Sequence, residues 1–83
     1  MRLVYFAWVR ERVGQATEEI SVPGDVTTVR GLMDWLSAKG ENYAHAFAEP
    51  KAIRAAVNQN HVPLDAPLAG AVEVAFFPPV TGG

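Results

Sequence analysis

The sequence predicts an α+β fold, in which a mixed β-sheet curls over one main helix and a second short helix lies beside it. Runs of apolar, β-branched and aromatic residues near both ends of the chain indicate strands. A central stretch repeats apolar residues at the helical spacing. With 83 residues, the chain is long enough for one small domain with a single core.

Two strands are expected near the start of the chain. The first covers residues 2–10, because residues 3–9 form a short apolar run rich in aromatic and β-branched side chains. We expect Gly14 to close a connection and residues 17–22 to form the second strand. The two strands together indicate a hairpin.

The main helix is predicted to begin near Thr27 or Thr28 and to run to about Lys39. Either threonine hydroxyl can accept a hydrogen bond from an unpaired amide of the first turn. Apolar residues at positions i, i+3, i+4 and i+7 form one stripe that faces a core: Val29, Leu32, Met33 and Leu36. Gly40 suits a left-handed residue just past the end of the helix.

A second, shorter helix is expected over residues 42–49, because Pro50 prevents its continuation. Strand character returns over residues 51–58. Turn residues then lead to a brief strand near residues 61–62.

The last strand is expected over residues 72–77, and its alternate members can face the helix: Val72, Val74 and Phe76. Two prolines follow, and proline cannot donate the hydrogen bonds of a sheet, so pairing stops there. We therefore expect a domain over residues 1–77 and a flexible C-terminal Gly-Gly tail over residues 78–83. The order of strand, strand, helix, strand, strand, strand is typical of the β-grasp (ubiquitin-like) fold.

Charge and hydropathy exclude several classes of partner. The formal net charge is -2 and the seven Lys and Arg residues are scattered, so no basic stripe fits a nucleic acid. The longest apolar run, residues 3–9, is far shorter than the roughly 20 residues that span a bilayer. We expect a cytoplasmic protein with no nucleic-acid and no membrane partner.

The side chains do not predict an active site. The chain has no cysteine, which removes disulfides, thiolate metal sites and cysteine nucleophiles. His45 and His61 have no neighbouring ligand pattern, so no metal is expected. No glycine-rich phosphate loop is present, so we expect no bound cofactor. Three carboxylates near the predicted hairpin are interpreted as parts of a solvated turn: Glu11, Glu18 and Glu19.

The C-terminal tail suggests a mechanical role instead. It consists of Pro78, Pro79, Val80, Thr81, Gly82 and Gly83. When extended, it reaches roughly 20 Å at about 3.3 Å per residue, enough to place a terminal carboxylate in a partner's buried site. The glycines let a narrow channel close around the backbone, and the prolines stiffen the base. A frayed end is the alternative, but fold, prolines and glycines together favour function.

Several stretches across the chain match one known family. The most specific is residues 74–83, Val-Ala-Phe-Phe-Pro-Pro-Val-Thr-Gly-Gly. Others are residues 6–11, the helix start near Thr28, and residues 55–59. The sequence thereby resembles the small, sulfur-carrying subunits of molybdopterin synthase. It departs from them at Gly70, which is displaced by one position from the glycine that the family usually has before the last strand.

The resemblance implies a mechanism that uses the carboxylate of Gly83. An adenylating enzyme of the ubiquitin-activating type would use ATP to form a glycyl adenylate, and a sulfur donor enzyme would convert this to a thiocarboxylate. The molybdopterin synthase large subunit would receive the tail, and sulfur would pass to cyclic pyranopterin monophosphate to form the molybdopterin dithiolene. The family assembles as two small plus two large subunits. The chain would thus be the sulfur-donating subunit of a sulfurtransferase, without catalytic side chains of its own.

Docking on a large subunit requires a surface as well as a tail. Phe6 and Phe77 are the candidate partner-binding residues, since the other members of the last strand are expected to face the helix. Core packing is an equal alternative for Phe6. Trp8 shares the alternation of Phe6 in the predicted strand and would extend the patch.

Other functions are compatible with the same fold. A sulfur carrier for thiamine thiazole synthesis shares the terminal glycines, although the Phe-Phe-Pro-Pro stretch argues against it. A carrier for cysteine synthesis is a similar option. A ubiquitin-like protein modifier would be joined to lysines through Gly83. An interaction module would bind through its sheet and leave the tail idle.

Overall fold

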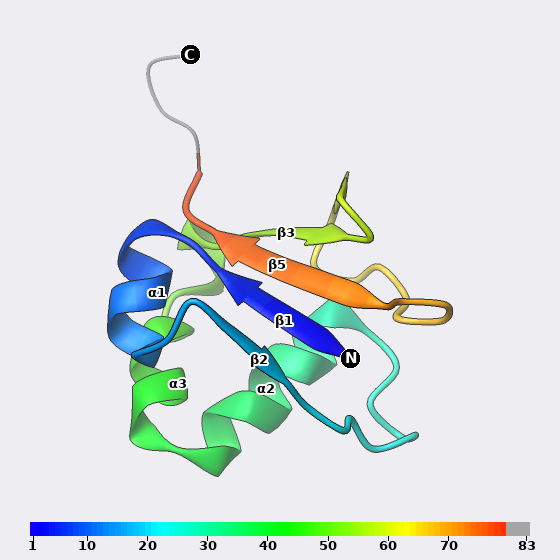
Figure 1. Ribbon diagram of the computed structural model, residues 1–83, viewed down its shortest axis with the longest axis horizontal. Coiled ribbons are helices and arrows are strands. Elements are labelled where there is room, and N and C mark those ends of the chain that lie inside the picture. The colour runs from blue at the N-terminus through cyan, green and yellow to red at the C-terminus, as the bar shows by residue number, and fades with distance from the viewer. Residues whose placement is uncertain (80–83) are drawn as a thin grey trace.

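A five-stranded mixed sheet forms the framework of the molecule (Figure 1). The computed structural model describes residues 1–79. The strands are β1 (Arg2–Tyr5), β2 (Thr17–Glu19), β3 (Arg54–Val57), β4 (Asn60–Val62) and β5 (Glu73–Phe77). They lie in the order β2-β1-β5-β3-β4. The predicted mixed sheet of an α+β fold is confirmed.

The pairing places β5 in the middle of the sheet. β5 runs parallel to β1, with Leu3 opposite Val74, and antiparallel to β3, with Ala55 opposite Phe76. The outer pairs, β1 with β2 and β3 with β4, are antiparallel. The first and last strands of the chain therefore lie side by side (Figure 1).

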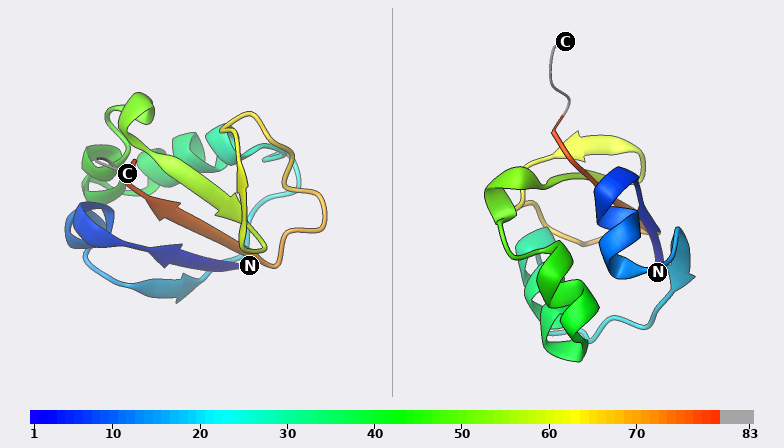
Figure 2. Two further views of the ribbon diagram at one scale, coloured as in Figure 1. Left: turned by 90° about the horizontal axis from the view of Figure 1, so that it is seen from above. Right: turned by 90° about the vertical axis from the view of Figure 1, so that its left-hand side faces the viewer.

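The helices are α1 (Ala7–Val13), α2 (Val29–Lys39) and α3 (Glu41–Ala46), with a short 3-10 helix, η1 (Pro50–Ala52). Figure 2 shows α2 and α3 together on one face of the sheet, while α1 lies at one end of it. The core fills the space between the two layers. The sheet contributes Leu3, Tyr5, Ala55, Val74 and Phe76, and the helices contribute Val9, Val13, Val29, Leu32, Met33, Leu36, Tyr43 and Ala46.

The main helix, α2, begins as predicted. The Thr28 hydroxyl oxygen accepts a hydrogen bond from the Gly31 amide at 3.0 Å, and the predicted apolar stripe is buried. The prediction for Gly40 is wrong, because its φ of -171° is extended and not left-handed. The reason is that α3 starts at the next residue, so the chain reverses through an extended glycine that also opens α3.

The predicted strand over residues 2–10 is wrong beyond Tyr5. Phe6 is extended, Ala7 turns with a φ of +51°, and the chain then forms α1. Val9 and Val13 lie one helical turn apart and are both buried. Gly14 ends the helix at a φ of +95°, where its amide donates to the Arg10 carbonyl oxygen. The two N-terminal strands pair as expected, but a helix connects them where a turn was predicted.

Several of the remaining elements are shorter than predicted. α3 ends at Ala46, and β3 begins at Arg54, because residues 50–52 form η1. β5 begins at Glu73, one residue late. Val72 was expected to face the helix, but its side chain is 72% exposed. It lies before the strand, where its amide donates to the Asn58 side-chain oxygen.

Candidate functional site

The candidate site is the end of β5, where the chain leaves the sheet. This end is anchored on three sides. Phe76 is fully buried, with its ring stacked on Tyr5 at 6.2 Å and edge-on to Phe47 at 5.0 Å. The Phe6 amide donates to the Phe76 carbonyl oxygen at 3.1 Å. The end of β5 is therefore held by contacts with the core and by a hydrogen bond to the backbone after β1.

The predicted end of pairing is confirmed. β5 stops at Phe77, and Pro78 and Pro79 lie outside any strand and are half-buried. The rest of the predicted tail lies outside the described residues: Val80, Thr81, Gly82 and Gly83. Their proposed roles stay predictions.

Strand alternation gives the sheet a second face that the helices do not cover. Because Val74 and Phe76 point into the core, Glu73, Ala75 and Phe77 point the other way. We call this side of the sheet the open face. By the same alternation and register it carries Arg2 and Val4 of β1, Thr17 and Glu19 of β2, Arg54 and Ala56 of β3, His61 of β4, and Glu73, Ala75 and Phe77 of β5.

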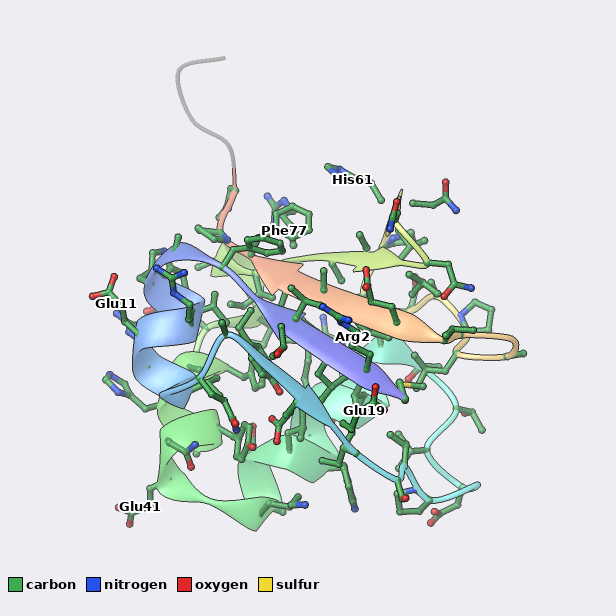
Figure 3. All side chains as sticks on the ribbon, viewed as in Figure 1. Arg2, Glu11, Glu19, Glu41, His61 and Phe77 are labelled. Carbon is green, nitrogen blue, oxygen red and sulfur yellow. The ribbon has the colours of Figure 1, made fainter. Side chains whose placement is uncertain are left out.

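The centre of the open face is apolar, and its tail end carries Phe77 with Arg54 opposite it on β3. Ala56 and Ala75 are only 6% and 7% exposed, although no helix covers them, because larger neighbours enclose these small side chains. Phe77 is half-buried, and its ring lies 5.1 Å from that of His61 (Figure 3). A partner that docked here would cover an apolar surface next to the start of the tail.

Phe6 lies beside this surface at the turn between β1 and α1. Its side chain is 49% exposed, so the alternative that it packs in the core is wrong. The prediction that Trp8 points to the same side of a strand as Phe6 is wrong, because Trp8 lies on α1. The Arg12 guanidinium carbon lies 4.4 Å from the centre of the Trp8 ring. The structure thus brings Phe6 and Phe77 to the same end of the sheet, since Phe6 is bonded to Phe76.

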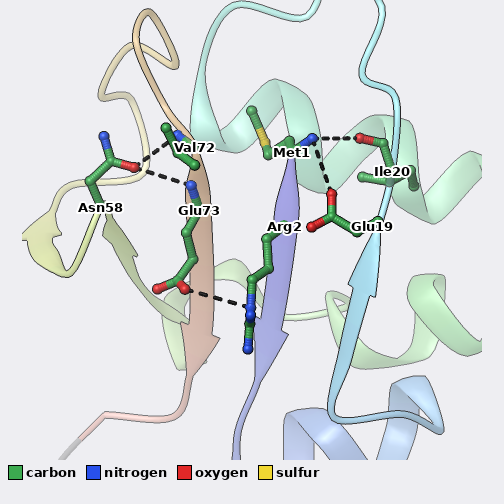
Figure 4. A network of polar contacts seen from close by, with 7 residues as sticks. All are labelled: Met1, Arg2, Glu19, Ile20, Asn58, Val72 and Glu73. Carbon is green, nitrogen blue, oxygen red and sulfur yellow. Dashed lines mark hydrogen bonds and ion pairs between the residues drawn. The ribbon is translucent and has the colours of Figure 1, made fainter.

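The opposite end of the open face is polar (Figure 4). The Arg2 Nε lies 3.7 Å from the Glu73 Oε1, and the N-terminal amine lies 3.7 Å from the Glu19 Oε2. Exposed ion pairs of this kind contribute little to stability. The two ends of the open face differ, because both signs of charge meet at this end, whereas Phe77 lies beside the cation Arg54 at the tail end.

A half-buried polar cluster lies on the helix side of the sheet. The hydroxyls of Tyr5 and Tyr43 both donate to the Glu18 Oε2, each at 2.7 Å. Glu18 is therefore not part of a solvated turn, whereas Glu11 and Glu19 are exposed. Burial and the Glu18 hydrogen bond raise the pKa of Tyr43 to about 12, and burial raises the pKa of Tyr5 further. This cluster joins β2 to α3 and is remote from the open face.

The described residues offer little for side-chain chemistry. Within residues 1–79, no three carboxylate or histidine side chains gather closely enough to hold a metal ion. The helices of this part of the chain are also too short or too polar to cross a bilayer.

Comparisons with known proteins agree with this architecture. The ThiS family matches residues 3–83. The molybdopterin synthase sulfur carrier subunit of Escherichia coli (strain K12) is 45% identical over 83 residues, which are 100% of this chain and 99% of that protein.

Two solved structures have the same fold. The putative molybdopterin converting factor, subunit 1, from Pyrococcus furiosus is 30% identical and covers 95% of each chain, with a TM-score of 0.73. The small archaeal modifier protein 1 of H. volcanii is 28% identical over 96% of this chain and 97% of that one, with a TM-score of 0.69. These neighbours confirm the β-grasp prediction. The chain therefore belongs to the ThiS family, together with the molybdopterin synthase sulfur carrier subunits.

Proposed function

We propose that this protein is the sulfur carrier subunit of molybdopterin synthase and acts in the cytoplasm. The observation that carries the proposal is the full-length match, at 45% identity, to a protein of that name. The fold supports it, because the central strand holds the base of the tail rigidly beside an uncovered apolar surface. A carrier needs such a combination of a docking face and a reaching terminus.

The proposed chemistry takes place at the Gly83 carboxylate. A partner adenylating enzyme joins this carboxylate to the adenylate of ATP and releases pyrophosphate, which converts a poor electrophile into an activated acyl group. A sulfur donor enzyme then supplies sulfur at the oxidation level of sulfide, which attacks the acyl carbon and displaces AMP. The product is a thiocarboxylate, whose sulfur is a nucleophile that requires no cysteine in the chain.

The large subunit would supply the catalytic side chains for the next step. The thiocarboxylate sulfur of this chain attacks a carbon of cyclic pyranopterin monophosphate, and a C–O bond of that carbon breaks, its oxygen leaving on phosphate or as water. Hydrolysis of the bond between the glycyl carbonyl and sulfur then returns the Gly83 carboxylate and leaves the sulfur on the substrate. Two sulfurs in the dithiolene require two carrier turnovers, which fits an assembly of two small plus two large subunits. In this assembly Phe6 and Phe77 of the small subunit contact the large subunit, and the residues between Pro78 and Gly83 enter its active site.

The intact mass of the protein from its native cells tests the proposal. We expect a fraction in which one oxygen is replaced by sulfur, and one alkylation by a thiol-directed reagent, although the chain has no cysteine. Fragmentation should place both changes on the C-terminal glycine. A protein that stays unmodified after incubation with ATP, an adenylating enzyme and a sulfur source would contradict the carrier function.

A second candidate function is covalent modification of other proteins. The specific observation in its favour is the likeness to the small archaeal modifier protein 1. Conjugates of higher mass in cell extract, lost when Gly83 is deleted, would support this role. The free protein together with a noncovalent complex alone would count against it.

A further inference from the structure

A small recess lies between the start of α2, the helix η1 and the end of β4, away from the centre of the open face. Its volume is about 290 Å³. The cationic side chains around it are Arg30, Lys51 and Arg54, and the apolar ones are Pro50, Ile53, Val62, Pro63 and Leu64. We call it the cationic recess.

The charge of this recess is opposite to that of the whole chain. It gathers three of the seven Lys and Arg residues of a protein whose net charge is -2, and none of its lining residues is acidic. Within residues 1–79, the ion pairs join Met1 to Glu19 and Arg2 to Glu73, so the three cations have no carboxylate partner there. The recess therefore presents positive charge that no carboxylate among these residues neutralises by a direct ion pair.

Backbone hydrogen bonds hold the walls of the recess in place. The Arg54 Nη1 donates to the carbonyl oxygens of Lys51 and Ile53, both at 3.1 Å, which fixes the guanidinium near η1. The Arg30 amide donates to the Leu64 carbonyl oxygen at 2.7 Å and ties α2 to the chain after β4. Because these walls are already fixed, binding of a ligand would cost little conformational entropy.

The floor of the recess indicates the kind of ligand. Ile53 is fully buried, and Val62 and Leu64 are half-buried. The floor is therefore a partly exposed apolar surface that is continuous with the hydrophobic core. The volume is slightly below the 300–1,000 Å³ or so that is usual for small-molecule sites. It suits one apolar side chain of a partner better than a whole metabolite.

A phosphate group fits these features less well. Phosphate sites in proteins usually converge several backbone amides on one point. Here the Arg30 amide is bonded to Leu64 and the Gly31 amide to Thr28, so neither points at an anion. The cations surround an apolar floor, which matches carboxylates placed on both sides of an apolar anchor.

We propose that the cationic recess binds an acidic segment of a partner protein, with one apolar side chain on the floor and flanking carboxylates at Arg30, Lys51 and Arg54. This site does not depend on the sulfur chemistry proposed above. Arg54 stands opposite Phe77 in the register of β3 and β5. A segment bound here therefore lies close to the base of the tail, where it can steer a partner toward it.

Titration of the isotope-labelled full chain with the peptide Glu-Glu-Leu-Glu-Glu, followed by amide chemical shifts, tests the proposal. We expect saturable shifts at Ile53, Val62 and Leu64 that weaken as salt rises. The double variant Lys51→Glu/Arg54→Glu should bind about tenfold more weakly. Lys39→Glu, at the far end of α2 and about 14 Å along the helix axis from Arg30, is the control and should bind like the unmodified protein.

Two further comparisons decide between ligand classes. Replacing the leucine of the peptide with serine should weaken binding, because the apolar floor then loses its contact. The variant Arg30→Glu/Lys51→Glu repeats the charge test without disturbing the Arg54 hydrogen bonds. Equal binding of both peptides and of inorganic phosphate would overturn the proposal in favour of a simple anion site. Absent shifts at the recess, or shifts unaffected by both charge reversals, would overturn it as well.

Discussion

The two tyrosines that donate hydrogen bonds to Glu18 should make the protein less stable at alkaline pH. The folded pKa of Tyr43 is about 12, against an ordinary value of 10.0, so the fold favours the neutral hydroxyl. The stabilisation is fully present below pH 10 and is lost as pH rises toward about 12, because the unfolded chain ionises first. Urea unfolding at increasing pH should show this decline.

Tyr43→Phe is the matched variant for this prediction. It keeps the ring but removes the ionisable hydroxyl, so its stability should decline less steeply over the same pH range than that of the unmodified protein. Tyr5 still contributes to the decline, because burial raises its pKa as well. An equally steep decline in both proteins would contradict the assignment to Tyr43.

The turn between β3 and β4 contains a residue that is poorly suited to its backbone. Gln59 has a φ of +69°, in the left-handed region, and it follows Asn58 at +49°. Hairpin turns of this kind favour Asn-Gly, because glycine has no Cβ to clash. Gln59→Gly should therefore stabilise the protein by about 1 kcal/mol in urea unfolding. Gln59→Ala, which keeps a Cβ, should give no such gain.

The N-terminus of α2 depends on one side chain. The Thr28 hydroxyl accepts a hydrogen bond from the Gly31 amide. Removing a cap of this kind costs about 1 kcal/mol. Thr28→Ala should lower the free energy of unfolding by that amount, and Thr28→Ser should retain most of it. If both variants lost the same amount, the methyl group and not the hydrogen bond would be the source of the effect.

At the scale of elements, the sequence predicted α2 and the strands better than it predicted α1. The apolar residues from Val29 to Leu36 recur at the spacing of a helix and of no other element. The Thr28 hydroxyl, which can cap the first turn, marks where that helix begins. Residues 3–9, in contrast, are all apolar, so their sequence shows neither the alternation of a strand nor the spacing of an amphipathic helix. The signals that were available are the spacing of Val9 and Val13 and a glycine directly after them.

The hydrogen bonds of the half-buried Glu18 to two tyrosines could not be read from its neighbours in sequence. A carboxylate near a predicted turn is usually solvated, and its partner Tyr43 lies 25 residues away on α3. The register that places Glu18 opposite Leu3, on the core side of the sheet, exists only once β1 and β2 pair. The candidate site was easier to predict, because Phe77 follows from alternation along a single strand.

For the whole molecule, the open face suggests where the proposed large subunit would bind. Phe77→Ala should weaken binding by about tenfold, as expected for an aromatic interface anchor, with little change in the urea midpoint. Val72→Ala is the matched control, because Val72 is an exposed apolar residue just before the other end of β5. A large loss of stability with unaltered affinity would place Phe77 in the core instead.

The core also predicts the effect of shortening the chain. Among residues 1–79, the buried members of the core all lie between Leu3 and Phe76. A variant without Gly82 and Gly83 should therefore keep the thermal midpoint of the full chain and lose the ability to accept sulfur. Retained biological activity in this variant would contradict a carrier function, even though the fold is intact.

The central position of β5 has a mechanical consequence. When a partner pulls on the chain beyond Phe77 along the strand direction, the force acts on two ladders at once, with four residue pairs to β1 and four to β3. Such a load shears the hydrogen bonds together, whereas an edge strand such as β2 could be peeled away one bond at a time. The position of β5 should therefore let a partner bind and release the C-terminal end of the chain without unfolding the domain.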